Sequence, residues 1–283
     1  MHDSRTAAQS NRRPAAVAGS WYPASRAGLE RTVDGYLDAA RANADAAAPP
    51  FPRALIAPHA GLMYSGPVAA HAYRLVGNGP YEAVVLVGPS HFVAFDGVAI
   101  WPRGAWATPL GDVPVAEELA AAIARPGAGV QEFPAAHARE HSLEMQMPFV
   151  ARLLPGVPIV PLLMGHQTRA TAERLGDLLA GALAARHVLI VASSDLSHYN
   201  DARTAAALDG VVIRHVEAFD PEGLMTSLER EPAHACGGGP MVAVLRAARA
   251  LGARRTRVLR YADSGDVSGD KDAVVGYLAA AAW

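Results

Sequence analysis

Each of three apolar segments of the chain is followed by side chains that can bind a metal or move a proton. They are His59 after RALIAP (53–58), His91 after EAVVLVG (82–88), and Asp195 and His198 after HVLIVAS (187–193). Such β-branched and leucine-rich segments are typical of strands buried on both faces. Parallel strands end along one edge of a sheet, where α/β proteins bind ligands. We therefore expect these side chains to converge, although a single histidine at a strand end is usually an ordinary loop residue.

The only cysteine, Cys236, is the fifth member of this set. It lies in AHACGGGP, where a turn of three glycines precedes Pro240 and a helical pattern that begins at Val242. A thiol just before a helix N-terminus is predicted to have a lowered pKa, because the positive end of the helix dipole stabilises the thiolate. The alternative is a buried, inert cysteine, which the glycines disfavour because such turns bring backbone close to another group.

Two kinds of chemistry fit these residues. A thiolate from Cys236 and neutral imidazoles from His59 and His91 form a good ligand set for a divalent transition metal, with positions left for water, oxygen or substrate. His198 would then donate or accept protons and Asp195 would orient a histidine. The alternative is a metal-free hydrolase or transferase with Cys236 as nucleophile, His198 as base and Asp195 orienting that base.

Other residues of the same motifs are weaker candidates for the pocket. In AREHSLEMQMPF, His141 and Glu144 stand three residues apart and are predicted to share a helical face. They form either a wall of the site or an ordinary helix start with Glu144 as the capping-box acid. We also place Tyr64, Ser90 and Gly237 at the pocket.

Strand-like and helical patterns alternate along the chain. Helical spacing of apolar residues is found at Leu29, Val33, Leu37 and Ala40, at Leu175, Leu178, Leu179 and Leu183, and at Val242, Leu245, Ala248 and Leu251. A fourth core strand is predicted at 157–165, a loop at the Pro/Gly-rich 101–114, and a hairpin or a pair of terminal strands at 258–262 and 273–280. This alternation predicts a single-domain α/β fold with a central, mainly parallel sheet flanked by helices on both sides.

Length and composition favour one globular domain at 14–283 after a loose tail at 1–13. Hydrophobic residues make up 51% of the 283 residues and charged residues 18%, which excludes a disordered chain. No apolar run is long enough to span a membrane, and no signal peptide is evident, so a cytoplasmic protein is expected. With a net charge of -2 and no basic cluster, the chain carries no signature of nucleic-acid or anionic-membrane binding.

The motifs taken together resemble the Memo family, whose bacterial members are called AmmeMemoRadiSam system protein B. The resemblance extends from about Arg13 to the C-terminus and is carried by AVAGSWYP, APHAGLMYSG, LVGPSH, REHSLEMQMPF, SSDLSHY, CGGGP and SGDVSGDKDAVVGY. The family's fold is similar to that of the class III extradiol dioxygenases, the LigB-like enzymes. The resemblance therefore implies an αβ sandwich around a central mixed sheet.

This resemblance also implies roles for individual residues. His59, His91 and Cys236 match the family's metal-binding set, with Fe(II) or copper as the associated ion and zinc as a third option. Asp195 and His198 match its other pocket positions, and His198 corresponds to the acid/base histidine of the related dioxygenases. Those enzymes use a carboxylate where this chain has Cys236. A soft, oxidisable thiolate shifts metal preference, so ring cleavage does not follow from the likeness.

Partners are implied only by the resemblance. The eukaryotic side of the family is linked to phosphopeptide recognition, so the pocket is expected to hold either a small molecule or a peptide. Phosphate recognition usually needs an arginine cluster, and none is evident near the motifs. The bacterial family name associates the protein with a radical SAM enzyme and an AMMECR1-type protein.

Overall fold

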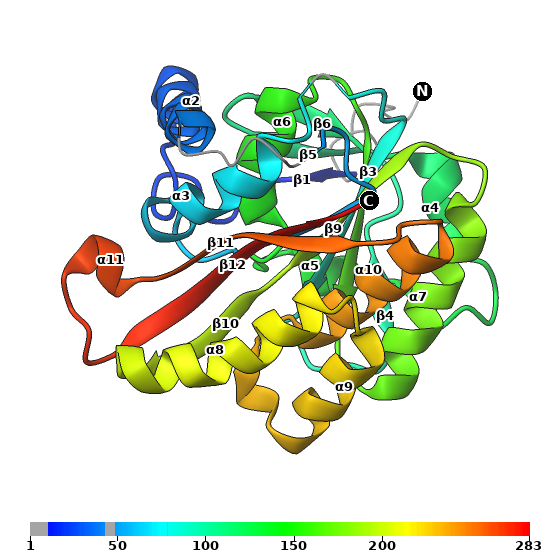
Figure 1. The fold of residues 1–283 in the computed structure, drawn as a ribbon. Coiled ribbons are helices and arrows are strands. Elements are labelled where there is room, and N and C mark those ends of the chain that lie inside the picture. Colours follow the sequence, from blue (N-terminus) through cyan, green and yellow to red (C-terminus); the bar gives the residue numbers. More distant parts are fainter. Residues whose placement is uncertain (1–10, 43–48, 78) are drawn as a thin grey trace.

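The computed structural model describes residues 11–42, 49–77 and 79–283 (Figure 1). Among them, nine strands form a mixed sheet in the order β10-β12-β2-β9-β3-β8-β4-β7, with β11 paired to β12. The strands are β2 (Ala54–Ala57), β3 (Ala83–Pro89), β4 (Val98–Ile100), β7 (Val130–Glu132), β8 (Ile159–Met164), β9 (Val188–Ser193), β10 (Asp195–Asn200), β11 (Thr256–Asp263) and β12 (Val274–Ala282).

The centre of the sheet is parallel, as the apolar segments predict. Neighbours β2 and β9, β9 and β3, and β3 and β8 all run in the same direction. Every residue of these four strands is buried, because helices cover both faces of the sheet. Antiparallel pairing at β4, β12 and β10 makes the sheet mixed, and the predicted C-terminal hairpin is present as β11 and β12.

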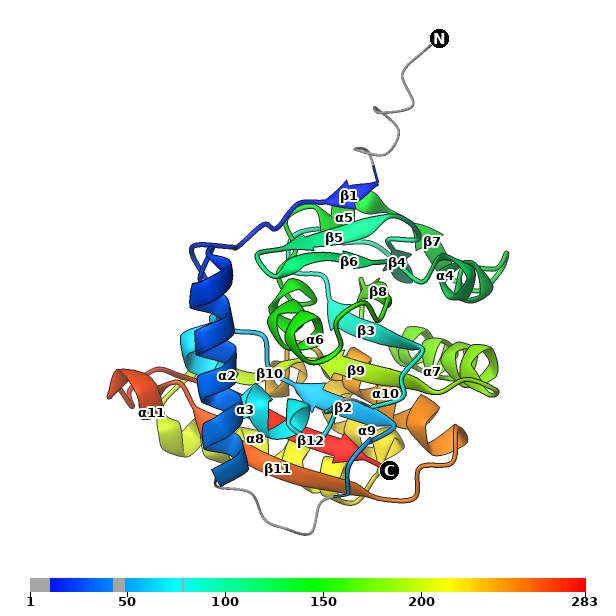
Figure 2. The ribbon, with the colours of Figure 1, turned by 90° about the horizontal axis from the view of Figure 1, so that it is seen from above.

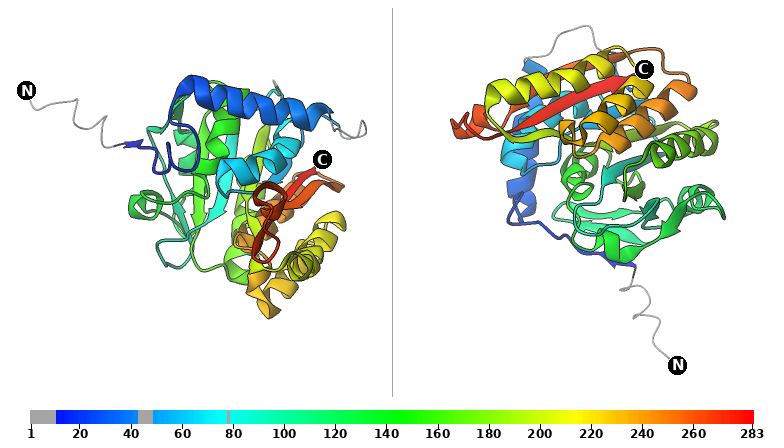
Figure 3. Two further views of the ribbon diagram at one scale, coloured as in Figure 1. Left: turned by 90° about the vertical axis from the view of Figure 1, so that its left-hand side faces the viewer. Right: turned by 90° about the horizontal axis from the view of Figure 1, so that it is seen from below.

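Helices lie on both faces of the sheet (Figure 2). They are α2 (Arg26–Ala42), α3 (Leu62–Tyr73), α4 (Glu117–Ile123), α5 (Pro134–His137), α6 (Met147–Leu153), α7 (Arg169–Leu183), α8 (Ala202–Glu217), α9 (Pro221–Arg230), α10 (Gly238–Ala250) and α11 (Gly265–Ser268), with short 3₁₀ turns η1 (Glu144–Gln146) and η2 (Pro232–His234). One face carries α7 and α10 with α8 and α9, and the other carries α3 and α6. Helix α2 packs outside α3 (Figure 3). The three predicted helical patterns bury their apolar residues in α2, α7 and α10, except that Leu251 follows the last residue of α10 and is only partly buried.

The predicted loop at 101–114 is wrong. Strands β5 (Ala105–Thr108) and β6 (Gly111–Pro114) form an antiparallel hairpin there, and β1 (Arg12–Arg13) pairs with β5 to complete a small second sheet. The hairpin forms because Trp106 and Val113 face each other across it and are both buried. The Pro and Gly residues of this segment lie mainly at its turns and ends, which hides the strand pattern.

The boundary of the predicted tail is also wrong. Residues 1–10 lie outside the described residues, but Arg12 and Arg13 belong to β1. The guanidinium of Arg13 is fully buried, lies 4.1 Å from the centre of the Trp106 ring, and pairs with Glu144 at 2.6 Å. The described part of the chain has no helix that is both long and apolar enough to span a bilayer.

Candidate metal centre

Three potential metal ligands meet at the edge of the sheet where the parallel strands end. His59 follows β2, His91 follows β3, and Cys236 lies between η2 and α10. One ligand atom from each of the three lies within 4.8 Å of the other two. The thiol Sγ of Cys236 is 3.3 Å from Nε2 of His59, and the two imidazole rings are 5.2 Å apart. The expected convergence of these three residues is therefore present.

The hydrogen bonds around His59 determine which ring nitrogen carries the proton. The hydroxyl of Ser193 donates to the carbonyl of Ser142 at 2.6 Å and accepts from Nε2 of Gln146 at 2.7 Å. Since this hydroxyl has only one proton, Nδ1 of His59, 2.9 Å away, must donate to it. Burial, followed by the nearby His91 and His141, lowers the pKa of His59 far below its usual value. The ring is therefore neutral, with the lone pair of Nε2 directed toward the thiol.

A carboxylate orients the second imidazole. Glu140 accepts the backbone N–H of His91 at 2.5 Å and contacts Nδ1 of its ring at 2.8 Å. It also accepts the backbone N–H groups of His141 and Ser142, each at 2.9 Å. Burial alone would raise the pKa of Glu140, but the bonds to His91 and the backbone lower it to about 2. Glu140 is thus a carboxylate that binds the Nδ1–H of His91, which leaves Nε2 free, a common arrangement around metal-binding histidines.

The predicted lowering of the Cys236 pKa is wrong. Burial, and next the negative charge of Asp195, raise the pKa of the thiol. The N-terminal N–H groups of α10 do not stabilise a thiolate, because that of Gly237 donates to Ser194 and that of Gly239 to Gln167. A backbone N–H, that of Asp195, does point at Sγ from 3.3 Å, but it does not offset burial. Without a cation beside it, the thiol is neutral.

The carboxylate of Asp195 accepts hydrogen bonds from backbone N–H groups and from no imidazole ring of the described residues. Its Oδ1 accepts the N–H groups of His59 at 2.7 Å and Ala60 at 3.3 Å. Burial raises the pKa of Asp195 to about 7, in spite of these bonds. The expectation that Asp195 orients a histidine ring is therefore wrong: Ser193 and Glu140 orient the two rings, while Asp195 fixes the chain that carries His59.

His198 lies on β10, partly buried, with its ring 5.7 Å from that of Tyr199. Burial lowers the pKa of His198, and this side chain is near enough to influence the pKa of His59. The imidazole that contacts the thiol of Cys236 is His59, however, so the structure does not form the expected Cys236–His198–Asp195 triad.

His141 and Glu144 separate instead of sharing a helical face. His141 precedes η1, and its ring stacks on that of His91 at 4.6 Å and lies 4.4 Å from that of Trp21, so it forms a wall of the site. Glu144 begins η1 and is buried. It accepts hydrogen bonds from Arg13 at 2.6 Å, from the backbone N–H groups of residues 16 and 17, and from Tyr22 at 2.7 Å. Glu144 is thus neither a pocket residue nor a helix cap, but the anchor of the N-terminal segment.

The three remaining predicted pocket residues have different positions. Tyr64 lines a separate cavity of about 420 Å³ beside α3. The hydroxyl of Ser90 donates to the carbonyl of Val93 at 2.7 Å and so shapes the loop that carries His91. Gly237 lies against the chain after β9, and a side chain there would collide with the carbonyl of Ser193.

Sequence reasoning missed the groups that orient the ligands. These groups are Glu140, Ser193, Gln146 and Gln167. A signal existed for Glu140 and Ser193, since each stands in a polar motif beside a candidate residue. No signal in the sequence places Gln146 or Gln167, because their partners are distant in the chain.

Fold and site together define the class of protein: an α/β sandwich with a mixed central sheet and a cluster of two histidines and one cysteine at the edge where its parallel strands end. The chain belongs to the Memo family, since the family model described as Memo-like protein matches residues 13–281. It is 40% identical over 272 residues to a MEMO1 family protein of Methanothermobacter thermautotrophicus, covering 94% of this chain and 98% of the relative. A MEMO1 family protein of Thermotoga maritima is 39% identical over 277 residues, covering 95% of this chain and 99% of the relative.

A solved structure is similar in fold alone. The crystal structure of the uncharacterized protein JW3007 from Escherichia coli K12 matches with a TM-score of 0.50 and 16% sequence identity. The match covers 80% of this chain and 98% of the other. It agrees with the α/β architecture predicted from the sequence.

Proposed function

We propose that this protein binds one transition metal ion through Nε2 of His59, Nε2 of His91 and Sγ of Cys236, with Fe(II) or copper as the ion and a redox or oxygen-linked role. One observation carries the proposal. The three atoms lie within 4.8 Å of one another, and the Nδ1 atom of each histidine is already engaged by a separate partner. The Nε2 lone pair of each histidine is therefore left for a metal, and that of His59 faces the thiol.

The donor set suits a borderline or soft ion. A coordinated thiol loses its proton, so a bound cation would reverse the effect of burial on Cys236. When bound, iron or copper would supply electron transfer and open positions for a small ligand. The protein would contribute oriented imidazoles through Ser193 and Glu140, and Asp195 would keep the His59 segment in place.

Catalysis by a metal-free thiolate receives less support. A nucleophilic cysteine needs a lowered pKa or a nearby base that takes its proton. Here burial raises the pKa of Cys236, and the adjacent His59 is held neutral with its own pKa lowered. Both groups therefore favour an uncharged pair over a thiolate and imidazolium pair.

The test is metal content by mass spectrometry on protein purified without oxygen and offered Fe(II), Cu(I) and Zn(II) separately. We expect near-stoichiometric iron or copper in the wild type and its loss in His59→Ala and Cys236→Ser. His166→Ala is the matched control, because His166 is exposed and outside the cluster, and it should retain the ion. Absence of metal from the wild type, or its retention by both site variants, would overturn the proposal.

A further inference from the structure

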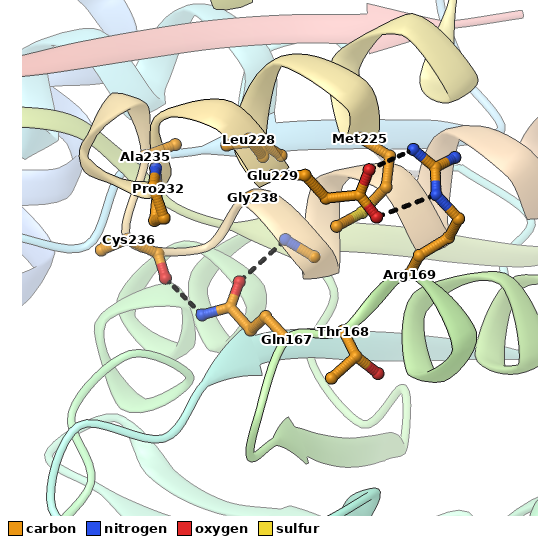
Figure 4. Close-up of a pocket in the computed structure, with 11 residues that line it drawn as sticks. Gln167, Thr168, Arg169, Met225, Leu228, Glu229, Pro232, Ala235, Cys236 and Gly238 are labelled. Atoms are coloured by element: carbon orange, nitrogen blue, oxygen red, sulfur yellow. Dashed lines mark hydrogen bonds and ion pairs between the residues drawn. The ribbon is translucent and has the colours of Figure 1, made fainter.

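A second cavity is lined in part by Cys236 but by neither His59 nor His91. It has a volume of about 480 Å³ and lies between the start of α7, helix α9 and the start of α10 (Figure 4). Its wall is formed by Met225, Leu228, Pro232, Ala235 and the glycines of the α10 start, with Gln167, Thr168, Arg169 and Glu229 as polar members. Cys236 also lines this cavity and is the one residue that it shares with the candidate metal centre.

Cys236 takes part in both sites through different atoms. Its Sγ contacts Nε2 of His59 in the metal centre. Its backbone carbonyl accepts a hydrogen bond of 2.7 Å from Nε2 of Gln167, whose Oε1 accepts the N–H of Gly239 at 2.8 Å (Figure 4). The amide of Gln167 thus donates to and accepts from the backbone on either side of the glycine turn, which fixes its position in the cavity wall.

The charges at this cavity are already neutralised. Arg169 donates two hydrogen bonds to Glu229, of 2.9 and 2.6 Å (Figure 4). It also donates to the hydroxyl of Thr226 at 3.1 Å. A charged ligand would have to compete with this pair, because the cavity offers no other charged side chain. The remaining wall is mainly apolar, and its volume falls within the range of about 300 to 1,000 Å³ that is common for small-molecule sites.

We propose that this cavity binds a small, uncharged aromatic molecule. Met225 and Leu228 supply apolar contact, and the thioether of a methionine packs favourably against an aromatic ring. A side chain at Gly238 would collide with Leu228, so this glycine lets the start of α10 pack closely against α9 at the cavity wall.

The test uses 4-fluorophenol as the neutral probe and 4-fluorobenzoate as a charged probe of similar size. Fluorine NMR is recorded while metal-free protein is titrated, and carbon-labelled methionine methyl groups report the position of the probe. We expect saturable binding of the phenol with a shift of the Met225 methyl signal, assigned with Met225→Leu. We expect binding of the benzoate to be at least tenfold weaker.

Amino-acid substitutions test whether the phenol binds in this cavity or in another one. Leu228→Trp fills the interior of the cavity and should weaken binding of the phenol at least tenfold. If this variant fails to fold, Pro232→Trp, at an exposed position on the rim, should weaken binding in the same way. Val267→Trp is the control, because Val267 is exposed and lines the separate cavity beside α3. The proposal is overturned if the wild type shows no saturable binding, if the benzoate binds equally well, or if the control weakens binding as much as the folded cavity variants.

Discussion

Replacing Glu140 by glutamine tests whether this carboxylate holds His91 in position. Glutamine has the same shape but only one acceptor oxygen, so its NH₂ group would face the N–H groups that the carboxylate now accepts. The pKa of Glu140 falls from 4.5 to about 2 in the folded protein, and the residue is fully buried. This difference corresponds to a stabilisation of about 3 kcal/mol at neutral pH. We therefore expect Glu140→Gln to lower the free energy of unfolding by roughly that amount.

The pH dependence has a defined sign. Because the folded-state pKa of Glu140 is depressed, its stabilisation is complete above the unfolded value of 4.5 and is lost as the pH falls toward about 2. Urea unfolding followed by circular dichroism at several pH values should show this loss in the wild type and a smaller slope in the variant. Metal affinity, measured by competition with a chromophoric chelator, should fall by about 10- to 100-fold, as for other residues that orient a ligand.

The matched control is Glu132→Gln, because Glu132 forms a half-exposed ion pair with Arg103 at 2.6 Å. Removing such a pair should change stability by less than about 1 kcal/mol and leave metal affinity unchanged. If Glu140→Gln were as stable as this control at neutral pH and kept the acid slope of the wild type, the role assigned to Glu140 would be refuted.

Three further predictions follow from buried contacts. Arg13→Met should cost about 3 to 5 kcal/mol in urea unfolding, because it leaves a buried carboxylate unpaired, whereas Arg12→Met should cost less than about 1 kcal/mol; equal losses would contradict the assigned burial. Gly237→Ala should lower the melting temperature and weaken metal binding, because the new side chain would collide with backbone. Gly181→Ala, with open space around it, should be neutral or stabilising by up to about 1 kcal/mol. An unchanged melting temperature for Gly237→Ala would argue against close packing of this glycine on the backbone. Alkylation of Cys236 in metal-free protein should be slower than that of glutathione at neutral pH and accelerate as the pH rises, and fast alkylation without this dependence would show that the thiolate is stabilised.

The core of the fold could be predicted because burial leaves a clear pattern in sequence. Four apolar segments became β2, β3, β8 and β9, and the convergence of His59 and His91 followed from parallel pairing. The hairpin at β5 and β6 was missed, because Pro and Gly dominate the composition of a segment that buries few side chains. Short strands of this kind depend on tertiary contacts more than on local pattern.

The chemistry of the site was less predictable than its location. The expectation that the α10 dipole lowers the pKa of Cys236 rests on neighbouring residues alone. The desolvation that raises this pKa comes from segments far away in the chain. Glu144 looked like a local helix cap, but its partner Arg13 lies 131 residues earlier. Local spacing carries no information on such pairs, because they form only when distant elements pack together.

The distance along the chain between the proposed ligands has a consequence for biosynthesis. Cys236 is 177 residues away from His59, and the two meet only after the parallel strands have paired and α10 has docked. In a zinc finger, by contrast, nearby ligands allow the ion to drive folding. Here the ribosome completes both histidine segments long before Cys236 is made, so an ion held by all three residues must enter a chain that has already folded. Which ion it is then depends on the metals available to the finished protein, and the choice of expression host becomes part of any experiment on this site.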